Sequence, residues 1–220
     1  MHNLVDSNTH YLYDLIIDPG KNNKELVAPN KDINYAHQII LTLVKELEKG
    51  HLIIFDSWYD SINLCKDLTR MGFNYISILR NNSTDLPDKL KLANSSKKYA
   101  YNNEYHMKIR QYDDKKLINF VTSTNLNLEE LKKSYNILNR GIDKMNQVIS
   151  YYNIDRKSYK WWKKVFFFGI EAAISNSKII FEYINKSNKE DNLRFRINLF
   201  SQLLTNNDED LNDSNITIKN

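Results

Sequence analysis

Short apolar runs alternate with helix-like segments in the first part of the chain. Leu52 to Phe55 is the clearest run: four apolar residues, two of them β-branched isoleucines, lie between segments with helical periodicity. A run so short and apolar is typical of a buried parallel strand. Further strands are predicted over Asn3 to Val5 and over Tyr11 to Ile17, the second of which stops at the turn sequence Asp18-Pro19-Gly20. A brief strand is predicted over Glu25 to Ala28.

Helical spacing of apolar residues predicts a helix on each side of the Leu52 to Phe55 strand. Asp32 suits the N-cap of the first helix, and Gly50 suits the position just after its end. The second helix covers Ser61 to Met71, and the alternating segment Phe73 to Leu79 is predicted to be another strand. Because crossovers between parallel strands are right-handed, this order predicts an α/β fold with a mixed sheet, antiparallel at its start and parallel afterwards, flanked by helices.

The second half of the sequence changes from strand-like to helical patterns. Tyr105 to Arg110 and Leu117 to Ser123 flank a polar turn and predict a β-hairpin. From Leu128 onward the periodicity is helical, with a long helix over about Ser158 to Tyr183. We therefore expect one domain over residues 1–204, with an insertion at about 81–125 that contains the hairpin and a helical C-terminal third. The remaining residues, 205–220, are rich in Asn and Asp, and we expect a disordered tail there.

Composition narrows the class of protein. With 220 residues, 41% of them hydrophobic, the chain can bury one sizeable core. Cys65 is the only cysteine, which excludes a disulfide framework or a cysteine-based zinc module within the chain. The N-terminus lacks the pattern of a secretory signal. The most apolar stretch, Val165 to Phe181, is interrupted by polar residues and shorter than the roughly 20 residues that a bilayer requires. We expect a soluble intracellular protein that does not enter a membrane.

Three aspartates are candidates for a catalytic site. Asp56 directly follows the buried strand, and open α/β sheets build their sites at the carboxyl ends of such strands. Asp6 follows the first predicted strand, and Asp143 lies near the start of a predicted helix. Hard divalent cations bind carboxylate oxygens, and two such ions can activate a nucleophile and stabilise the leaving oxygen of a phosphodiester. The alternative is that Asp56 only caps the following turn, and spacing alone does not decide between the two.

The sequence around each aspartate matches a motif. Asp6-Ser7-Asn8-Thr9 matches a D-S-x-T-like pattern, Asp56 to Ser61 a D-N-[FW]-[FY]-T-S-like pattern, and Gly141 to Gln147 a G-V-D-x-x-D-Q-like pattern. Downstream, Tyr151 to Trp162 is a basic segment that carries tryptophans. In this order, from about Asp6 to Leu204, the segments resemble the catalytic domain of piggyBac transposases, which belong to the DDE group and have a ribonuclease H-like fold.

The resemblance implies a reaction, a cofactor and a partner. Asp6, Asp56 and Asp143, with Asn146 as a candidate further ligand, would hold two Mg²⁺ or Mn²⁺ ions. These ions would support hydrolysis at a transposon end and then attack of the freed 3′-hydroxyl on target DNA at TTAA. The implied partner is DNA and the implied compartment is the nucleus. A homodimer would form through regions that this chain does not contain.

The chain departs from the family pattern in several places. Asn146 stands where an aspartate is common, Asp60 where threonine is usual, and Arg140 at a usual glycine position. An amide oxygen can coordinate a cation but adds no charge, so we expect weaker metal binding at Asn146. The family's N-terminal DNA-binding region and its cysteine-rich zinc domain have no counterpart in the sequence. We therefore expect a catalytic-core fragment, a decayed element or a derived host protein.

A dense basic segment interleaved with aromatic rings is the candidate DNA contact. Its residues are Arg156, Lys157, Lys160, Trp161, Lys163 and Lys164. Nucleic-acid grooves combine phosphate attraction with aromatic contacts, although a solvated helix face with a buried aromatic side gives the same pattern. Two rival functions also remain open: a catalytically inactive DNA-binding or interaction protein that keeps the fold, and a simple nuclease that uses the same acids without strand transfer.

Overall fold

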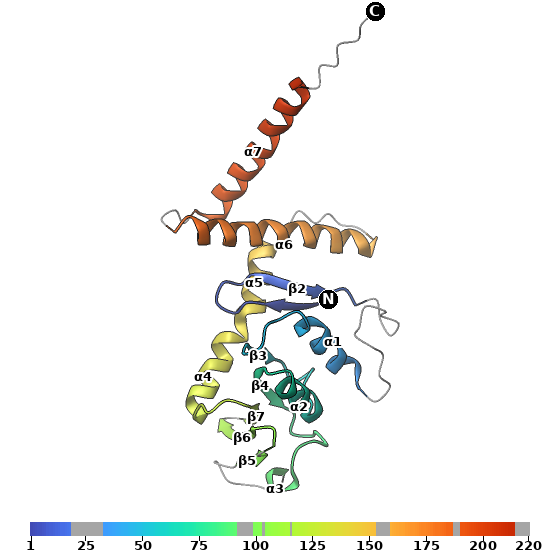
Figure 1. Cartoon of the computed structure of the whole chain (residues 1–220), viewed down its shortest axis with the longest axis vertical. Helices are drawn as coiled ribbons and strands as arrows, with labels where there is room; N and C mark the ends of the chain where they lie inside the picture. The colour runs from blue at the N-terminus through green and yellow to red at the C-terminus, as the bar shows by residue number, and fades with distance from the viewer. Residues whose placement is uncertain are drawn as a thin grey trace, which may run out of the picture. The chain divides into compact units, whose positions relative to one another are not determined.

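The computed structural model describes residues 1–18, 33–91, 99–102, 104–114, 116–152, 159–186 and 190–213. The chain divides into two compact units, Met1–Gln147 and Val148–Asn220. The strands are β1 (His2–Val5), β2 (Leu12–Ile16), β3 (Leu52–Phe55), β4 (Asn74–Leu79), β5 (Tyr99–Asn102), β6 (Met107–Asp114) and β7 (Lys116–Thr122). The helices are α1 (Tyr35–Val44), α2 (Ile62–Arg70), α3 (Asp88–Lys91), α4 (Leu128–Leu138), α5 (Arg140–Tyr151), α6 (Trp161–Ile184) and α7 (Asn192–Asp213) (Figure 1).

The strands form two sheets. Five of them lie in the order β3-β4-β7-β6-β5, in which β3 and β4 are parallel and all other neighbours are antiparallel. The prediction of a mixed sheet flanked by helices is confirmed. However, β1 and β2 form a separate antiparallel pair, because no backbone ladder joins them to the other described strands. The strand predicted at Glu25 to Ala28 and the turn residues Pro19-Gly20 lie outside the described residues.

Helices α1 and α2 begin at side-chain caps. The Asn34 side chain accepts a hydrogen bond from the His37 amide at 2.8 Å, and the Ser61 side chain accepts one from the Leu64 amide at 3.1 Å. Each bond satisfies an amide that the first turn of a helix leaves without a partner. Ser61 is where the sequence predicts the second helix to start. The predicted cap of the first helix, Asp32, lies outside the described residues.

Helix α1 packs against both sheets and holds them together. Its apolar side chains fall into two buried rows with helical spacing. One row, Ile39 and Leu43, clusters with residues of the β1-β2 hairpin, and the other, Ile40 and Val44, clusters with residues of β3. The hairpin and β3 therefore both pack against α1, although no ladder hydrogen bonds join the hairpin to β3.

The five-stranded sheet carries helices on both faces. Neighbouring residues of β4 point to opposite faces, so Tyr75 clusters with α1 and α2 whereas Ile76 clusters with Leu131 and Tyr135 of α4. The predicted hairpin is formed by β6 and β7, and because β7 also pairs with β4, the hairpin is part of the sheet. The carboxyl ends of the parallel strands β3 and β4 are thus held between helices on both sides.

A buried ion pair joins the two helices of the second unit. Arg196 Nη2 of α7 lies 2.6 Å from Glu171 Oε2 of α6. The Arg196 guanidinium also lies 4.8 Å from the centre of the Tyr152 ring. Both charged groups are almost completely buried. Burying two charges is costly unless they are paired, so this pair fixes how α7 meets α6.

The two long helices differ in how well the sequence predicts them. Helix α6 agrees with the helix predicted over Ser158 to Tyr183. Helix α7 continues to Asp213, whereas the composition predicts a disordered tail from Thr205. The residues in between include neither Pro nor Gly, so no strong helix breaker ends α7 earlier. Within the described parts of the chain, no helix is long and apolar enough to cross a bilayer.

Candidate active site

Asp56 lies in the turn that follows β3, as the sequence predicts. Its side chain is exposed, and its Oδ1 atom accepts a hydrogen bond from the Ser57 amide at 2.6 Å. The Asp56 carbonyl accepts one from the Tyr59 amide at 3.0 Å. The helix that follows is capped by Ser61 and not by Asp56. Burial raises the pKa of Tyr135 to about 12, with further contributions from the Asp56 and Asp60 charges, so α4 lies within electrostatic reach of this turn.

Asp6 closes the loop between β1 and β2. Its Oδ1 atom accepts hydrogen bonds from the Asn8 amide at 3.0 Å, from the Thr9 amide at 2.6 Å and from the Thr9 hydroxyl at 2.8 Å. Burial raises the pKa of Asp6, but these bonds and the nearby His10 outweigh burial and leave the pKa below its usual value. The D-S-x-T-like motif thus serves a turn in which the carboxylate substitutes for missing backbone partners.

Asp6 and Asp56 lie at opposite ends of β1 and β3. At the start of β1, the His2 ring stacks on Trp58 at 5.5 Å, and His2 Nδ1 lies 2.7 Å from the Tyr59 hydroxyl, so this end is beside the Asp56 turn. At the other end of β1, Asp6 lines a groove together with His51, which precedes β3. A strand rises about 3.3 Å per residue, so roughly 13 Å of β1 separates Asp6 from His2. The prediction that Asp6 and Asp56 share metal ions is not supported by this geometry.

Asp143 and Asn146 are exposed on one face of α5. Their spacing of three residues brings a carboxylate and an amide oxygen together on that face. The helix begins against the loop after β1: a Cβ atom at the buried Gly141 would lie 3.0 Å from the Ser7 Cα atom. Glycine in this motif is therefore explained by a close approach of two backbones.

The described residues do not assemble a three-acid metal centre. Among them, no three side chains of His, Cys, Asp or Glu are gathered closely enough to hold an ion. Asp56, Asp143 and Asn146 carry oxygen ligands of the kind that Mg²⁺ and Mn²⁺ prefer, but Asp6 does not join Asp56. The Gly141 contact places the start of α5 beside the Asp6 loop, so the three motifs remain separate candidates, with Asp56 in the turn after β3 and Asp143 and Asn146 on the exposed face of α5.

Asp60 is a buried carboxylate, which the sequence marked only as an aspartate at a position where threonine is usual. It accepts hydrogen bonds from the Ser77 hydroxyl and, at 3.8 Å, from the Cys65 thiol, while its Oδ2 atom is buried without a hydrogen-bond partner. Burial raises the pKa of Asp60 to about 6 against the lowering effect of these two bonds, and the Asp85 charge raises it further. An acid at a usual threonine position was the only sequence signal for this group.

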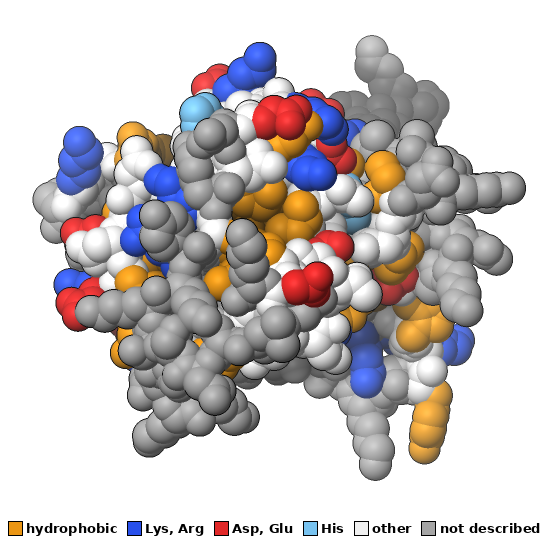
Figure 2. All heavy atoms as spheres, turned by 90° about the horizontal axis from the view of Figure 1, so that it is seen from below, with side chains coloured by type: hydrophobic (Ala, Val, Ile, Leu, Met, Phe, Trp, Pro, Cys, Tyr) orange, Lys and Arg blue, Asp and Glu red, His pale blue; other side chains and the backbone are white. Residues whose placement is uncertain are grey.

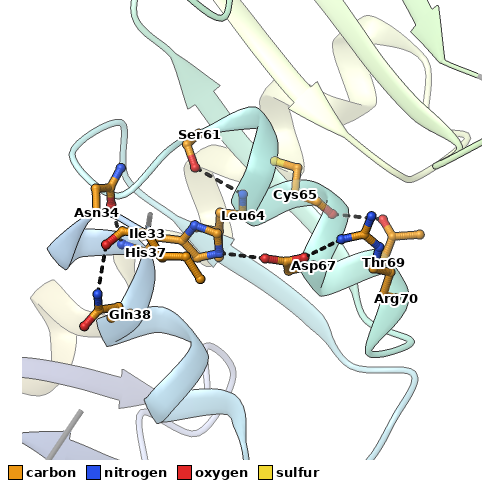
Figure 3. A network of polar contacts seen from close by, with 10 residues as sticks. All are labelled: Ile33, Asn34, His37, Gln38, Ser61, Leu64, Cys65, Asp67, Thr69 and Arg70. Carbon is orange, nitrogen blue, oxygen red and sulfur yellow. Dashed lines mark hydrogen bonds and ion pairs between the residues drawn. The ribbon is translucent and has the colours of Figure 1, made fainter. Parts of the chain in front are cut away.

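A polar network between α1 and α2 was not predicted from the sequence. His37 Nε2 lies 3.1 Å from Asp67 Oδ2, and Asp67 Oδ1 lies 2.8 Å from Arg70 Nη1 (Figure 3). Burial lowers the pKa of His37, although Asp67 acts in the opposite direction. These groups border a polar pocket of about 490 Å³ that also includes Ser61 and Asp85. The network links α1 and α2, the helices that precede and follow β3.

The basic segment lies in the second unit, at the start of α6. Trp161 and Trp162 are 65% and 51% exposed, so they do not form the buried aromatic side of a solvated helix. Lys163 Nζ lies 5.8 Å from the centre of the Trp162 ring, and Lys164 is exposed. Lys160 occupies the N-cap position. Arg156 and Lys157 lie outside the described residues.

The face of the molecule drawn in Figure 2 differs from this basic segment. On that face, acidic and basic side chains are interspersed around an apolar area. The formal net charge of the whole chain is only +4. Attraction to nucleic acid would therefore depend on local clusters of cations more than on overall charge.

Comparisons with known proteins agree with this fold. The family model described as Transposase IS4, a DDE transposase family, matches residues 1–178. The cryo-EM structure of a piggyBac transposase synaptic complex with hairpin DNA is similar, with a TM-score of 0.80 and 20% sequence identity. The match covers 90% of this chain but only 44% of that one, so the chain spans less than half the length of the solved transposase. At this identity the structural match shows a shared fold, and the family match over most of the sequence shows that the chain belongs to the DDE transposases of the Transposase IS4 family.

Proposed function

We propose that residues 1–220 act as a transposase core that binds DNA but does not, on its own, carry a complete set of metal-binding acids. The observation that carries this proposal is the separation of Asp6 and Asp56 by the length of β1. The start of α5, which carries Asp143, contacts Ser7 next to Asp6, so the three motif aspartates are not gathered at one end of β1. The geometry thus favours the catalytically inactive alternative for this chain acting alone.

DDE transposases generally use divalent metal ions. Asp56, Asp143 and Asn146 are exposed oxygen donors, but one of the three is a neutral amide. Asp6 adds no ligand beside Asp56, because it lies at the far end of β1. The described residues therefore do not fit a two-ion site. Hydrolysis at transposon ends and strand transfer at TTAA would require another carboxylate beside Asp56.

DNA is the proposed partner of the second unit. Exposed tryptophans beside lysines at the start of α6 offer stacking surfaces next to positive charge. The similar solved structure is itself a complex with hairpin DNA, which supports the same partner for this chain. A nuclear location and a homodimer are further proposals that follow from the family resemblance.

Binding and cleavage assays on the same protein test this proposal. Labelled duplexes with transposon-end and scrambled sequences would be titrated at roughly 50 and 200 mM salt, because lysine-dominated binding weakens steeply over that range. We expect salt-sensitive binding with little sequence preference, and no strand cleavage in Mg²⁺ or Mn²⁺. Absence of binding at low salt would refute the DNA assignment. Metal-dependent cleavage that disappears in Asp56→Asn would show that the site is complete after all.

A further inference from the structure

Helix α5 presents two positive charges on one exposed face within the first unit. Arg140 and Lys144 are both exposed, and their spacing of four residues places them on the same side of the helix, with Cβ atoms roughly 6 Å apart. Asp143 lies in the neighbouring row of the same helix. Among the described residues, no ion pair involves Arg140 or Lys144, so both charges are available to a ligand.

The backbone that carries these two side chains is held by packing. Met145, elsewhere around the helix, is only 1% exposed. Gly141 approaches the loop after β1 so closely that a Cβ atom there would lie 3.0 Å from the Ser7 Cα atom. A ligand that reaches the exposed face of α5 therefore meets the charges of Arg140 and Lys144 at a defined spacing.

The charge of this segment differs from that of the motif that it resembles. The G-V-D-x-x-D-Q-like pattern contains two carboxylates, and glycine is usual at position 140. In this chain Asn146 replaces one carboxylate, Arg140 replaces the glycine, and Lys144 occupies a position that the pattern leaves open. Two positive side chains and one negative side chain give residues 140–147 a formal net charge of +1. Paired carboxylates attract a divalent cation, whereas a segment of net positive charge attracts an anion.

Phosphate is an anion that suits such a pair of side chains. The arginine guanidinium can donate two parallel hydrogen bonds to a phosphate, and the lysine ammonium adds a compact positive charge. Because Arg140 and Lys144 lie on one helix face, both can reach one phosphate or two neighbouring phosphates of one strand. The proposed partner of this chain, DNA, displays such phosphates at regular intervals.

Two carboxylates oppose this attraction: Asp143, and Asp6 in the loop that contacts Gly141. In a metal-dependent site, a bound divalent ion would offset such carboxylates. Arg140 and Lys144 together carry the same charge of +2 as one Mg²⁺ ion, and they are permanently attached to the helix. Their N–H groups, five on the guanidinium and three on the ammonium, supply enough donors for a phosphate as well.

From these observations we propose that Arg140 and Lys144 bind backbone phosphate of DNA directly, without a bridging metal ion. They form a second DNA contact, separate in the sequence from the basic segment at the start of α6. This inference rests on the proposed function, because it takes DNA as the partner, and it assigns the α5 motif of this chain to phosphate binding.

A charge-removal experiment in EDTA tests the proposal. Binding of a labelled duplex to residues 1–220 would be measured by anisotropy at several salt concentrations. Arg140→Gln/Lys144→Gln should weaken binding by roughly tenfold at low salt and reduce the salt slope by about two, because each lost phosphate contact lowers that slope by about one. Lys45→Gln/Lys49→Gln is the matched control, since it removes the same charge from exposed positions elsewhere and should bind nearly as the parent does. Equal affinities of the two double variants would overturn the proposal.

NMR mapping separates this contact from that of α6. Adding the duplex in EDTA should shift the amides of residues 140–147 as well as those of residues 160–164. Shifts at residues 160–164 alone would overturn this inference and leave the proposed function intact, whereas absence of DNA binding would overturn both. Inorganic phosphate, at the same concentration of phosphate groups, should give much smaller shifts at residues 140–147; equal shifts would indicate a general anion site and contradict the DNA assignment. Shifts at residues 140–147 that appear only after Mg²⁺ is added would also refute a direct contact.

Discussion

Replacing Asp60 by asparagine should remove much of the pH dependence of stability in the first unit. Burial gives the Asp60 carboxyl a pKa of about 6 instead of 3.8. The folded protein thus holds this proton more tightly than the unfolded chain does. For such a group, the stability contribution is greatest below pH 4 and is lost as the pH rises through 6.

The magnitude follows from the two pKa values. The difference between 3.8 and about 6 corresponds to about 3 kcal/mol, at about 1.4 kcal/mol for each pH unit. In Asp60→Asn, the side-chain carbonyl still accepts the hydrogen bond from Ser77, and the amide group occupies the buried position of Oδ2. Any cost of burying the amide is independent of pH. The free energy of unfolding of the variant, relative to the parent, should therefore rise by roughly 2 to 3 kcal/mol between pH 4 and pH 8, slightly less than the full difference because the carboxyl of the unfolded chain is already partly ionised at pH 4.

His37 contributes a slope of the opposite sign. Because burial lowers its pKa in the folded state, His37 disfavours folding as the pH falls below its ordinary value of 6.5. The parent therefore shows the sum of two opposing effects between pH 4 and 6.5. The effect of His37 is common to the parent and Asp60→Asn, so it cancels in the difference between them.

Urea denaturation at several pH values measures this difference. If both proteins carry Trp161→Phe and Trp162→Phe, Trp58 is the only tryptophan, and its fluorescence reports on the first unit alone. Asp60→Thr should also lose the Asp60 titration. If Asp60→Asn keeps the same pH dependence as the parent, Asp60 does not titrate in the way that its burial implies.

Three further predictions concern other contacts. Gly141→Ala should destabilise the first unit by about 1 kcal/mol or more, because its Cβ atom would press on the Ser7 backbone. Gly169→Ala is the control: its Cβ atom would meet open space within α6, so it should stabilise the protein by up to about 1 kcal/mol. Thermal melts that show equal effects of the two substitutions would contradict the Gly141–Ser7 contact. Glu171→Leu should lower the free energy of unfolding measured by chemical denaturation by about 3 kcal/mol, because it leaves Arg196 buried and unpaired. The double variant Glu171→Leu/Arg196→Met should recover most of that loss. A double variant as unstable as the single one would refute this prediction. Replacing Lys160, Lys163 and Lys164 by glutamine should weaken DNA binding in anisotropy titrations and make the affinity less dependent on salt concentration. The same change at the exposed Lys45, Lys49 and Lys133 should have little effect. Equal losses of affinity in the two triple variants would contradict the assignment of the DNA contact to the start of α6.

The sequence predicted the parts of the fold that local patterns determine. The run Leu52 to Phe55 identified β3, and Ser61 marked the start of α2, because strand burial and helix capping leave short-range signals. The separation of the β1-β2 hairpin from the main sheet was not predictable in this way. Hydrophobic pattern predicts that a strand exists, but it does not say which neighbour the strand pairs with.

The candidate site illustrates the same limit. The motif around Asp6 has the right residue types, yet its aspartate, together with Thr9, forms a turn at the far end of β1. A short pattern of Asp, Ser, Asn and Thr serves a tight loop as well as it serves a metal site, because both use carboxylate oxygens as acceptors. Only the direction of β1 relative to β3, a long-range property, distinguishes the two roles.

Paramagnetic mapping with Mn²⁺ tests the separation of Asp6 from Asp56 most directly. NMR spectra of the parent, of Asp56→Asn and of Asp6→Asn would be recorded while Mn²⁺ is added, and line broadening would be followed at the amides of residues 56–59. If the two carboxylates do not share an ion, Asp56→Asn should reduce this broadening and Asp6→Asn should leave it unchanged. An equal loss of broadening at residues 56–59 in Asp6→Asn would show that Asp6 and Asp56 bind the same metal ion and would contradict this account.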